Sequence, residues 1–354
     1  MQTSENSQQT SENSQQTSES SQQTSESSQQ TMGALVHREY GSFDVLSVQQ
    51  VPRPAPKHDE VLVRVRAAGL HVGDCFMVRG APFVMRLVGG LLKPKTGIPG
   101  FDLAGHVEAV GSSVTEFLPG DEIFGSNDGT CAEYVCPKEK TLALKPGQLT
   151  FEQAAAIPTS ALAALHALRD AGKVQPGHKV LINGASGGVG TFAVQIAKFL
   201  GAEVTGVCST QNVETVRSLG ADHVIDYTRD DFTQGGPRFD VILDNVENRT
   251  LSHCRRALTP DGTLILNSGT GAKGFAFLKR LLKPLIVSPF VGQKLRRYIS
   301  LPNREDLIAL RGLVDSGKLI PVLDEVCTLA DAPAALARIE GGHVCGKIVT
   351  SVSA

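Results

Sequence analysis

The chain has 354 residues, of which 41% are hydrophobic and 20% are charged, and its formal net charge is −2. This balance is typical of a soluble globular protein of one or two domains, and a net charge so close to zero argues against a nucleic acid partner. The 7 cysteines are scattered along the chain, so we expect reduced thiols, no structural disulfide and a cytoplasmic location.

The first 31 residues repeat a polar heptapeptide, QTSENSQ and then QTSESSQ, with no apolar residue between Met1 and Met32. A coiled coil needs apolar residues at two positions of each heptad, so ordering this segment would bury nothing. We therefore predict a disordered tail over 1–31. Without an apolar core or any arginine it has the features of neither a secretory signal nor a transit peptide. An inert extension and a partner-binding tail both stay open.

Residues 32–150 contain short β-rich runs separated by Gly, Pro and Asp turns, which predicts an all-β module. Over 151–299, helices alternate with apolar strands, the pattern of a doubly wound parallel sheet. This second part begins with one predicted helix over 151–172, and Gly201 and Gly220 stand where helix C-caps belong. We expect the stretch from about 300 to 354 to return to the first domain.

The run KVLINGASGGVGTFAVQIAKFLGAEVTGVCS combines strand, glycine turn, helix and strand in one βαβ unit. Such a turn needs glycine because the pyrophosphate of a dinucleotide has to reach backbone N–H groups at the helix N-terminus, where the helix dipole favours negative charge. We therefore favour a dinucleotide site over a turn without a ligand. Amides of 187–190 and a serine hydroxyl would bind the phosphates, and the predicted residues are Gly184, Ser186, Gly187, Gly188, Val189 and Gly190.

The end of the second strand of this unit bears on the choice between NADPH and NADH. An NAD enzyme places Asp or Glu there to accept the ribose 2′-OH, whereas this chain has Cys208, Ser209 and Thr210. The missing acid favours NADPH, with Ser209 and Thr210 donating to a 2′-phosphate and Tyr227 reaching the same end of the cofactor. No Lys or Arg follows directly, so NADH stays open as the less favoured cofactor.

Read with GFDLAGHVEAVG, LDNV and the terminal GGHVCGKIV, these motifs resemble the zeta-crystallin-like quinone oxidoreductases of the medium-chain dehydrogenase superfamily, over residues 32–354. The resemblance implies an α/β fold with a GroES-like catalytic domain (32–150, completed by about 300–354) and a Rossmann domain (151–299). It also implies metal-free hydride transfer from NADPH to a quinone or an α,β-unsaturated carbonyl. The further residues that it places against the cofactor are Asn245, Gly342, His343, Val344 and Cys345.

The chain departs from that family at several positions of the cleft and of the cofactor site. His71 stands where relatives have Asn, and Cys75 and Phe76 occupy positions that line the cleft in many relatives. Three further departures are Ala163 for Thr, Glu247 for Gly and Cys345 for Arg. These changes put NADPH affinity and turnover in question.

Zinc alcohol dehydrogenases share the implied architecture, but their ligand positions fall at His71, Phe101, Asp102 and near Thr159. This set gives at most two donors, whereas a catalytic zinc needs three, so we expect no bound metal. Hydride transfer then depends mainly on stacking nicotinamide and acceptor in a dry cleft. His71 is the candidate proton donor, with water as the alternative source and a bystander role for His71 left open. Asp74 is expected to hydrogen-bond its own turn.

Residues 273–297 carry basic side chains and no acid, and their apolar stretches are broken by Lys283, Pro284 and Pro289. The segment is too short and too charged to span a bilayer, which leaves weak peripheral membrane contact or a helix and loop over the cleft mouth.

The sequence therefore predicts an NADPH-dependent reductase of a small quinone or enone, either a monomer or a homodimer. The rival interpretation is a non-catalytic NADPH-binding scaffold or sensor that recruits a partner through its repeat tail.

Overall fold

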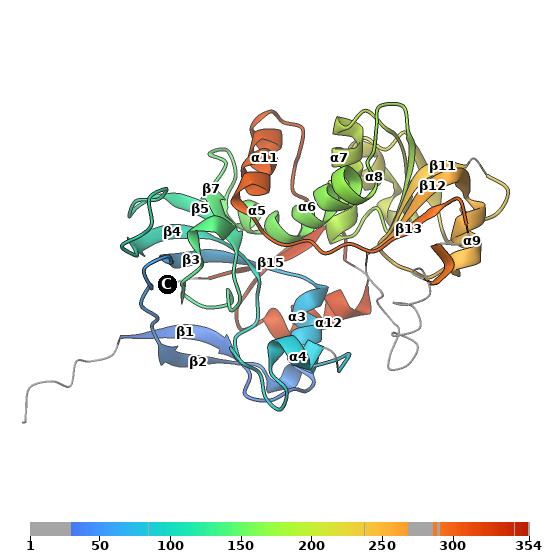
Figure 1. Ribbon diagram of the computed structural model, residues 1–354. Helices are drawn as coiled ribbons and strands as arrows, with labels where there is room; N and C mark the ends of the chain where they lie inside the picture. Colours follow the sequence, from blue (N-terminus) through green and yellow to red (C-terminus); the bar gives the residue numbers. More distant parts are fainter. Residues whose placement is uncertain are drawn as a thin grey trace, which may run out of the picture.

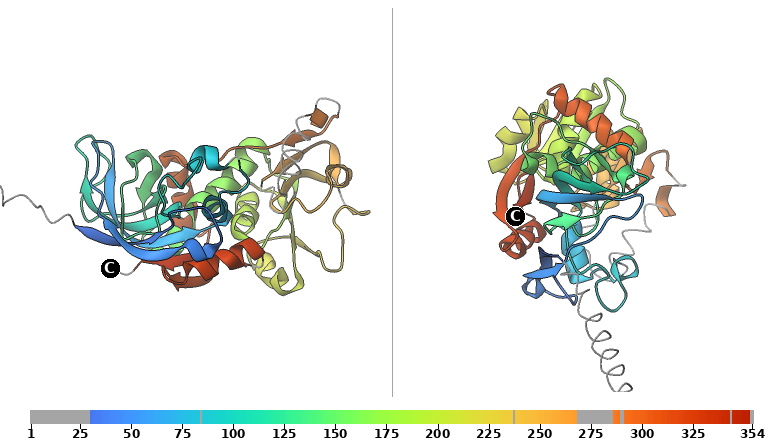
Figure 2. Two further views of the ribbon diagram at one scale, coloured as in Figure 1. Left: turned by 90° about the horizontal axis from the view of Figure 1, so that it is seen from below. Right: turned by 90° about the vertical axis from the view of Figure 1, so that its left-hand side faces the viewer.

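The computed structural model describes residues 30–83, 85–236, 238–267, 286–288, 291–342 and 344–352. Within these ranges the chain forms two large sheets that lie side by side (Figure 1 and Figure 2). The predicted tail lies outside the described residues except at its end. There β1 (Thr31–Val36) begins one residue before Met32 and pairs with β2 (Ser47–Pro52), so the tail ends slightly earlier than the sequence predicts.

The first sheet has seven strands in the order β14-β15-β3-β4-β5-β7, with β6 paired beside β3. Because β15 runs antiparallel to β3, the last strand of the chain joins the sheet that the first part began. The strands are β3 (Val61–Leu70), β4 (Asp102–Val110), β5 (Glu122–Ser126), β6 (Tyr134–Val135), β7 (Leu142–Leu144), β14 (Leu323–Thr328) and β15 (Lys347–Ser351).

The prediction of an all-β module is wrong between β3 and β4, where the helices α3 (Val72–Arg79) and α4 (Met85–Gly89) lie. A capping box starts α3. The Gly73 N–H donates to His71 Nδ1 over 2.9 Å, and the His71 N–H donates to Asp74 Oδ2 over 2.8 Å. Histidine is not among the usual capping residues, so the sequence pattern did not reveal this helix. Asp74 does hydrogen-bond its own turn, as predicted.

The second sheet has six parallel strands in the doubly wound order β10-β9-β8-β11-β12-β13, which confirms the predicted fold class. Gly201 and Gly220 follow α7 and α8 with φ of +82° and +101°, as expected of C-caps. The strands are β8 (Lys179–Asn183), β9 (Glu203–Cys208), β10 (His223–Asp226), β11 (Phe239–Asp244), β12 (Leu258–Leu266) and β13 (Lys294–Arg296). The helices are α7 (Gly188–Phe199), α8 (Val213–Ser218) and α9 (Leu251–Arg256).

The single helix predicted over 151–172 is divided into α5 (Phe151–Ala155), α6 (Pro158–Leu165) and a π-helical turn (His166–Ala171). Pro158 stands at the first position of α6, where its missing N–H costs no hydrogen bond within the helix. The predicted helix is interrupted at Ala156 and Ile157, between α5 and α6.

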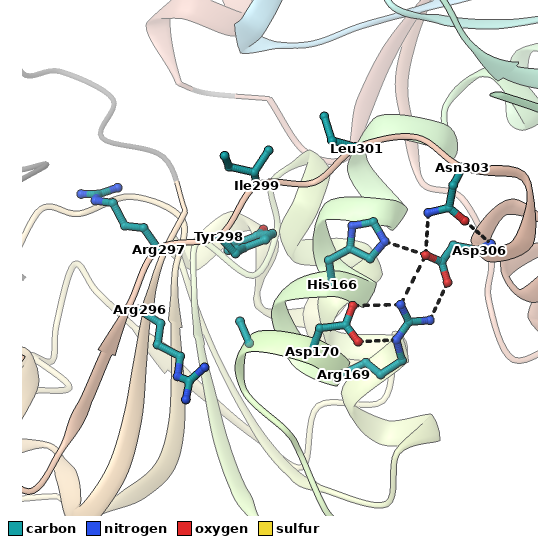
Figure 3. Close-up of a pocket in the computed structure, with 11 residues that line it drawn as sticks. His166, Arg169, Asp170, Arg296, Arg297, Tyr298, Ile299, Leu301, Asn303 and Asp306 are labelled. Atoms are coloured by element: carbon teal, nitrogen blue, oxygen red, sulfur yellow. Dashed lines mark hydrogen bonds and ion pairs between the residues drawn. The ribbon is translucent and has the colours of Figure 1, made fainter. Parts of the chain in front are cut away.

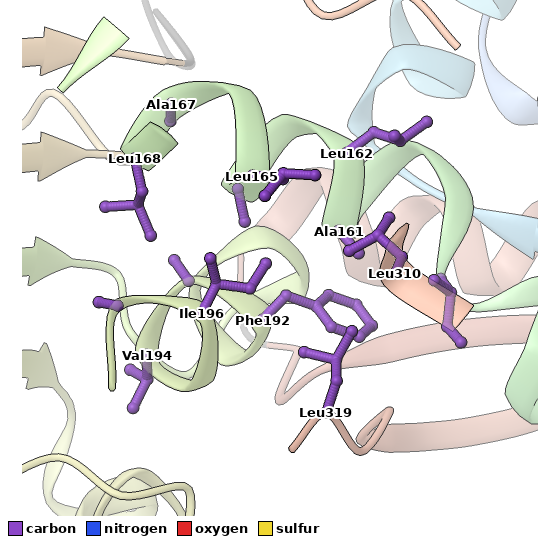
Figure 4. Close-up of a cluster of buried hydrophobic side chains, with 14 of the residues drawn as sticks. Ala161, Leu162, Leu165, Ala167, Leu168, Phe192, Val194, Ile196, Leu310 and Leu319 are labelled. Atoms are coloured by element: carbon purple, nitrogen blue, oxygen red, sulfur yellow. The ribbon is translucent and has the colours of Figure 1, made fainter. Parts of the chain in front are cut away.

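An apolar cluster fixes α6 against α7 and α11 (Arg304–Asp315) (Figure 4). Leu162 and Leu165 of α6 pack with Phe192 and Ile196 of α7 and with Leu310 of α11. The helix that begins at the glycine turn is thus held firmly against the segment that leaves the first sheet. No helix among the residues described reaches the length and hydropathy needed to cross a bilayer.

A buried charged cluster joins the two parts of the molecule. Lys347 on β15 and Asp102 on β4 are 2% and 0% exposed, and Lys347 Nζ lies 3.4 Å from Asp102 Oδ2. Asp102 Oδ1 accepts from the Thr159 N–H and hydroxyl over 2.8 and 2.5 Å. Thr159 belongs to α6, so one carboxylate ties the last strand, the first sheet and the helix leading to the second sheet together. A buried charge is tolerated only while such partners stay in place.

We expect Lys347→Met to lower the free energy of unfolding by about 3–5 kcal/mol, because it leaves the Asp102 carboxylate buried without its cation. Urea unfolding followed by circular dichroism measures the change. The double variant D102N/K347M removes both charges and should recover part of the loss. A single-variant cost below about 1 kcal/mol would show that the pair contributes little.

Candidate functional site

The predicted cofactor residues between Gly184 and Asn245 meet at the carboxyl edge of the second sheet. The loop 184–190 follows β8, Ser209 and Thr210 follow β9, Tyr227 follows β10 and Asn245 follows β11. These four strands are parallel and adjacent, so the segments after them share one edge. In sheets of this kind, ligands bind at that edge, near the strand where the order reverses. The structure thus brings together residues from four separate stretches of sequence.

The glycines of the loop 184–190 have two different roles. A Cβ at Gly190 would lie 2.0 Å from the carbonyl oxygen of Gly184, so packing within the loop demands glycine there. A Cβ at Gly187 would meet nothing closer than the same oxygen, at 3.5 Å. Packing does not explain Gly187, and the space left by its missing side chain fits a ligand in contact with the backbone.

The N-terminus of α7 is open to an anion. Gly187 is the N-cap, and no side chain caps the helix. Gly188, Val189 and Gly190 are the first three helical residues, so their N–H groups have no acceptor within the helix. The Gly187 N–H instead donates to Gly184 O over 3.1 Å, so the turn uses the amide that the sequence analysis assigned to the cofactor. Three amides and the helix dipole therefore fit a pyrophosphate.

A hydrogen-bonded contact links this loop to the end of β9. Asn212 Nδ2 donates to Ser186 Oγ over 3.1 Å and to Ser209 Oγ over 3.3 Å. A hydroxyl that accepts in this way keeps its own proton for a further acceptor. Both serine hydroxyls therefore keep a proton that is available for a ligand, and the predicted contacts with the cofactor stay a prediction. Asn212 was missed because a lone asparagine after a strand gives no sequence signal.

Thr210 makes a contact that differs from the predicted one. Its hydroxyl donates to Asp226 Oδ2, at the end of β10, over 2.6 Å. This hydrogen bond is the main cause that holds the pKa of Asp226 below its ordinary value. An acid therefore does stand at this edge of the sheet, one strand away from the position considered in the sequence. Tyr227 follows it and is 47% exposed.

A second polar group lies on the other side of the loop. Asn245 Oδ1 accepts from Asn267 Nδ2 over 2.7 Å, and the Tyr298 hydroxyl donates to Asn267 Oδ1 over 2.7 Å. The same hydroxyl lies 2.9 Å from the carbonyl oxygen of Ala163, and burial raises the pKa of Tyr298. Within the part of the chain that the structure describes, Asn245 Nδ2 is buried without an acceptor. A ligand oxygen there would remove the cost of that unpaired donor.

The terminal motif only partly reaches this edge. The Gly346 N–H donates over 2.8 Å to a carbonyl of the glycine loop, which brings the neighbouring Cys345 close to the loop. Val344 packs instead on an apolar cluster of the first sheet and α12 (Ala332–Gly341), so its side chain is not placed as predicted. Gly342 ends α12 with φ of +76°. His343 lies outside the described residues.

Glu247 stands in a loop conformation that favours glycine. Its φ is +54°, which accounts for the glycine usual at this position in the resembled family. The carboxylate is 5% exposed and receives two bonds from Arg297, of 3.0 and 2.8 Å. This paired contact offsets the backbone strain and connects the loop after β11 to the chain after β13.

His71 offers an unpartnered donor beside Phe101. The two rings stack with centroids 5.1 Å apart. Because His71 Nδ1 accepts from the Gly73 N–H, the proton of the neutral imidazole lies on Nε2. Among the described residues, Nε2 is buried and has no hydrogen-bond acceptor. An acceptor oxygen on a substrate fits this N–H.

Cys75 does not line the cleft, contrary to the prediction. Its side of α3 packs against α12, where it is 1% exposed and its thiol lies 3.4 Å from the Leu336 carbonyl oxygen. Burial raises the pKa of Cys75 to about 12, which makes the thiol unreactive. Phe76, the next residue, is half-buried. All seven cysteines of the chain are free thiols.

The positions compared with zinc ligands come together, but their donors are used otherwise. The Asp102 carboxylate already binds Thr159 and Lys347, and the Phe101 side chain has no atom that could bind a metal. In the described ranges, no group of three or more His, Cys, Asp or Glu side chains is arranged to hold a metal ion.

A separate pocket of about 480 Å³ lies between the π-helical turn and the start of α11 (Figure 3). None of the predicted cofactor residues lines it. Four of its polar groups interact with one another: Arg169 binds Asp170 and Asp306, and His166 Nε2 lies 2.8 Å from Asp306 Oδ2. The bond from Arg169 is the main cause that holds the pKa of Asp306 far below its ordinary range. We assign this pocket no ligand.

Two family models match the chain, the alcohol dehydrogenase GroES-like domain at residues 57–167 and the zinc-binding dehydrogenase domain at residues 219–350. The chain is 32% identical to the chloroplastic quinone-oxidoreductase homolog of Spinacia oleracea, over 90% of this chain and 98% of that protein. The chain belongs to the quinone oxidoreductase-like members of the medium-chain dehydrogenase/reductase superfamily. This membership confirms the resemblance predicted from the motifs and makes the protein an oxidoreductase.

Two further comparisons agree with that membership of the medium-chain superfamily. The chloroplastic NADPH-dependent alkenal/one oxidoreductase of Arabidopsis thaliana is 30% identical, over 90% of this chain and 79% of that protein. The solved structure of the quinone oxidoreductase from Coxiella burnetii is 30% identical, with a TM-score of 0.81, over 92% of this chain and 100% of that one. The GroES-like and Rossmann parts are thus those of a medium-chain reductase.

We expect Gly187→Ala and Gly190→Ala to have opposite main effects. G190A should lower the melting temperature by several degrees, because its Cβ meets backbone at 2.0 Å. G187A should leave the melting temperature nearly unchanged and weaken dinucleotide binding at least about tenfold, because its methyl group fills the space left for phosphate. Differential scanning calorimetry and titration calorimetry separate the two. If G187A bound the dinucleotide as tightly as the unsubstituted chain does, the assignment of the loop as the phosphate site would be wrong.

Proposed function

We propose that this oxidoreductase transfers a hydride from NADPH to a quinone or an α,β-unsaturated carbonyl compound, without a metal. The observation that carries the proposal is the uncapped N-terminus of α7, at the sheet edge where the predicted cofactor residues meet. The names of the spinach and Arabidopsis relatives support the same class of acceptor and, for the second, the same cofactor.

The bound nicotinamide supplies the hydride. The residues of this chain bind the cofactor, orient the two reactants and polarise the acceptor. The amides of Gly188, Val189 and Gly190 bind the pyrophosphate at the start of α7. Asn245 Nδ2 donates to an oxygen of the bound cofactor or acceptor. This buried donor thereby gains the hydrogen-bond acceptor that it lacks among the described residues. Correct placement of the two reactants then accounts for much of the rate.

His71 acts on the acceptor as a neutral hydrogen-bond donor. Its Nδ1 is held as an acceptor by the Gly73 N–H, so a second proton there would cost that bond. The Nε2–H donates to the carbonyl oxygen of the acceptor, on which negative charge develops as the hydride arrives at carbon. The proton that completes the product then comes from water. This role differs from the proton donor considered in the sequence analysis.

The preference for NADPH rests on the serine hydroxyls at Ser186 and Ser209 and on the absence of an acid at the end of β9. Asp226 opposes it, because its carboxylate holds Thr210 and would repel a 2′-phosphate bound near that hydroxyl. NADH is therefore the weaker but accepted alternative.

The test follows the oxidation of NADPH and of NADH with 1,4-benzoquinone, 9,10-phenanthrenequinone and a short 2-alkenal, on protein checked for zinc. We expect acceptor-dependent oxidation of NADPH without metal. Tight NADPH binding with no acceptor-dependent oxidation would overturn the proposal and favour the non-catalytic scaffold.

The rival scaffold interpretation depends on the tail, whose residues 1–29 lie outside the described ones. A cytoplasmic location and a monomeric or homodimeric state stay predictions.

We expect His71→Ser to lower kcat about 100-fold while the protein stays folded, because one donor to the developing oxyanion is lost. Serine is itself a good N-cap, so α3 keeps its first hydrogen bond. Steady-state kinetics with the preferred acceptor, beside a thermal unfolding curve, measure both. An unchanged kcat would mean that His71 is a bystander in the cleft.

We expect Asp226→Asn to raise the affinity for 2′,5′-ADP severalfold and to leave 5′-AMP binding unchanged, because only the first ligand carries the 2′-phosphate. Titration calorimetry measures both ligands without any turnover. Asp230→Asn is the matched control, since it removes an acid from the same loop that does not bond Thr210. The idea fails if D226N and D230N change the ratio of the two affinities equally.

A further inference from the structure

Four large apolar side chains are exposed on α4 and on the loops at either end of it. Phe83 is 65% exposed, Leu87 69%, Leu91 54% and Leu92 89%. Single exposed apolar residues are ordinary on soluble proteins, whereas a cluster of large ones marks a contact surface. We call residues 80–96 the α4 segment. It lies beside α3 and α12, on the first part of the molecule (Figure 1).

The charge of the α4 segment has one sign. Between Gly80 and Thr96 the sequence contains three basic residues, Arg86, Lys93 and Lys95, and no Asp or Glu. Lys93 and Lys95 are exposed and follow directly on the apolar pair Leu91 and Leu92. Apolar side chains bordered by cations complement a surface that presents anionic headgroups over an apolar interior.

Internal hydrogen bonds hold the backbone of the α4 segment in place. The Tyr40 hydroxyl donates to Gly90 O over 2.5 Å, and the Lys95 N–H donates to Gly89 O over 2.7 Å. Arg86 Nε donates to the Gly80 carbonyl oxygen over 3.0 Å, and its guanidinium lies 4.6 Å from the centre of the Tyr40 ring. The apolar side chains are therefore presented by a fixed platform, and little order has to be gained on binding.

We propose that the α4 segment docks the protein on a membrane surface that contains anionic lipids. Leu91 and Leu92 insert at the boundary of headgroups and acyl chains, and Lys93 and Lys95 pair with lipid phosphates. A second copy of the chain fits this surface poorly. A twofold contact would place each patch against itself and bring its lysines together, with no acid in the segment to match them.

The proposal of a membrane-binding α4 segment does not rest on the proposed reaction, although the α4 segment lies close to His71. Helix α3 begins after His71 and ends before Gly80, which spans about 12 Å at the rise of an α-helix. The basic stretch 273–297, in which the sequence analysis considered membrane contact, lies mostly outside the described residues and forms no part of this proposal.

The experiment measures co-sedimentation of the full chain with vesicles of phosphatidylglycerol and phosphatidylcholine, and with vesicles of phosphatidylcholine alone. We expect binding to the first at low salt, loss of binding as salt is raised, and little binding to the second. Leu92→Ser should lower the partition coefficient roughly tenfold, because an exposed leucine no longer enters the lipid. Lys93→Ser with Lys95→Ser should lower it about fivefold for each charge removed.

Leu118→Ser is the matched control, because Leu118 is 69% exposed but stands between Glu116 and Asp121, outside the α4 segment. It should leave vesicle binding unchanged, and all variants should keep the melting temperature. Three results would overturn the proposal. These are no binding at low salt, equal effects of L92S and L118S, or light scattering that shows a dimer of the full chain dissociated by L92S, which would make a second copy the partner.

Discussion

The architecture depends on the buried carboxylate of Asp102. Its two oxygens bind Lys347 from the last strand and Thr159 from the helix that leads to the second sheet, and all three groups are shielded from water to a large degree. A bare charge in that position would be too costly to keep, so the three elements have to arrive together. The stem of Lys347 also borders the glycine loop, 3.2 Å from the position of a Cβ on Gly188. The contact between the two sheets and the phosphate cradle is therefore one packed unit.

The polar groups around the cleft follow from that arrangement. With the last strand fixed, the Gly346 amide meets the glycine loop, and the loop leaves three helical amides open. The capping box of α3 fixes the tautomer of His71 and leaves its Nε2 donor buried without a partner among the described residues. Both groups fit the proposed reaction, in which placement and hydrogen bonding carry the catalysis.

Local patterns were enough to predict the doubly wound sheet, the glycine loop and the helix C-caps at Gly201 and Gly220, because neighbouring residues determine each of them. Contacts between distant residues were not accessible. Histidine capping hid α3, and the strand β13 has only three residues, too few for its alternation to be recognised in the sequence. The burial of Cys75 depends on α12, more than two hundred residues away, and the acid that reaches Thr210 comes from a neighbouring strand rather than from its own.

The placement of Asp226 on β10 has an evolutionary consequence. This strand is the outermost of its sheet and only four residues long, and its Asp226 carboxylate bonds Thr210 rather than the glycine loop. The group that we propose to oppose NADPH is thus on a different strand from the amides that we propose to bind the phosphates. By the proposed role of Asp226, single substitutions on this outer strand would alter the cofactor preference while the residues that bind the phosphates stay unchanged.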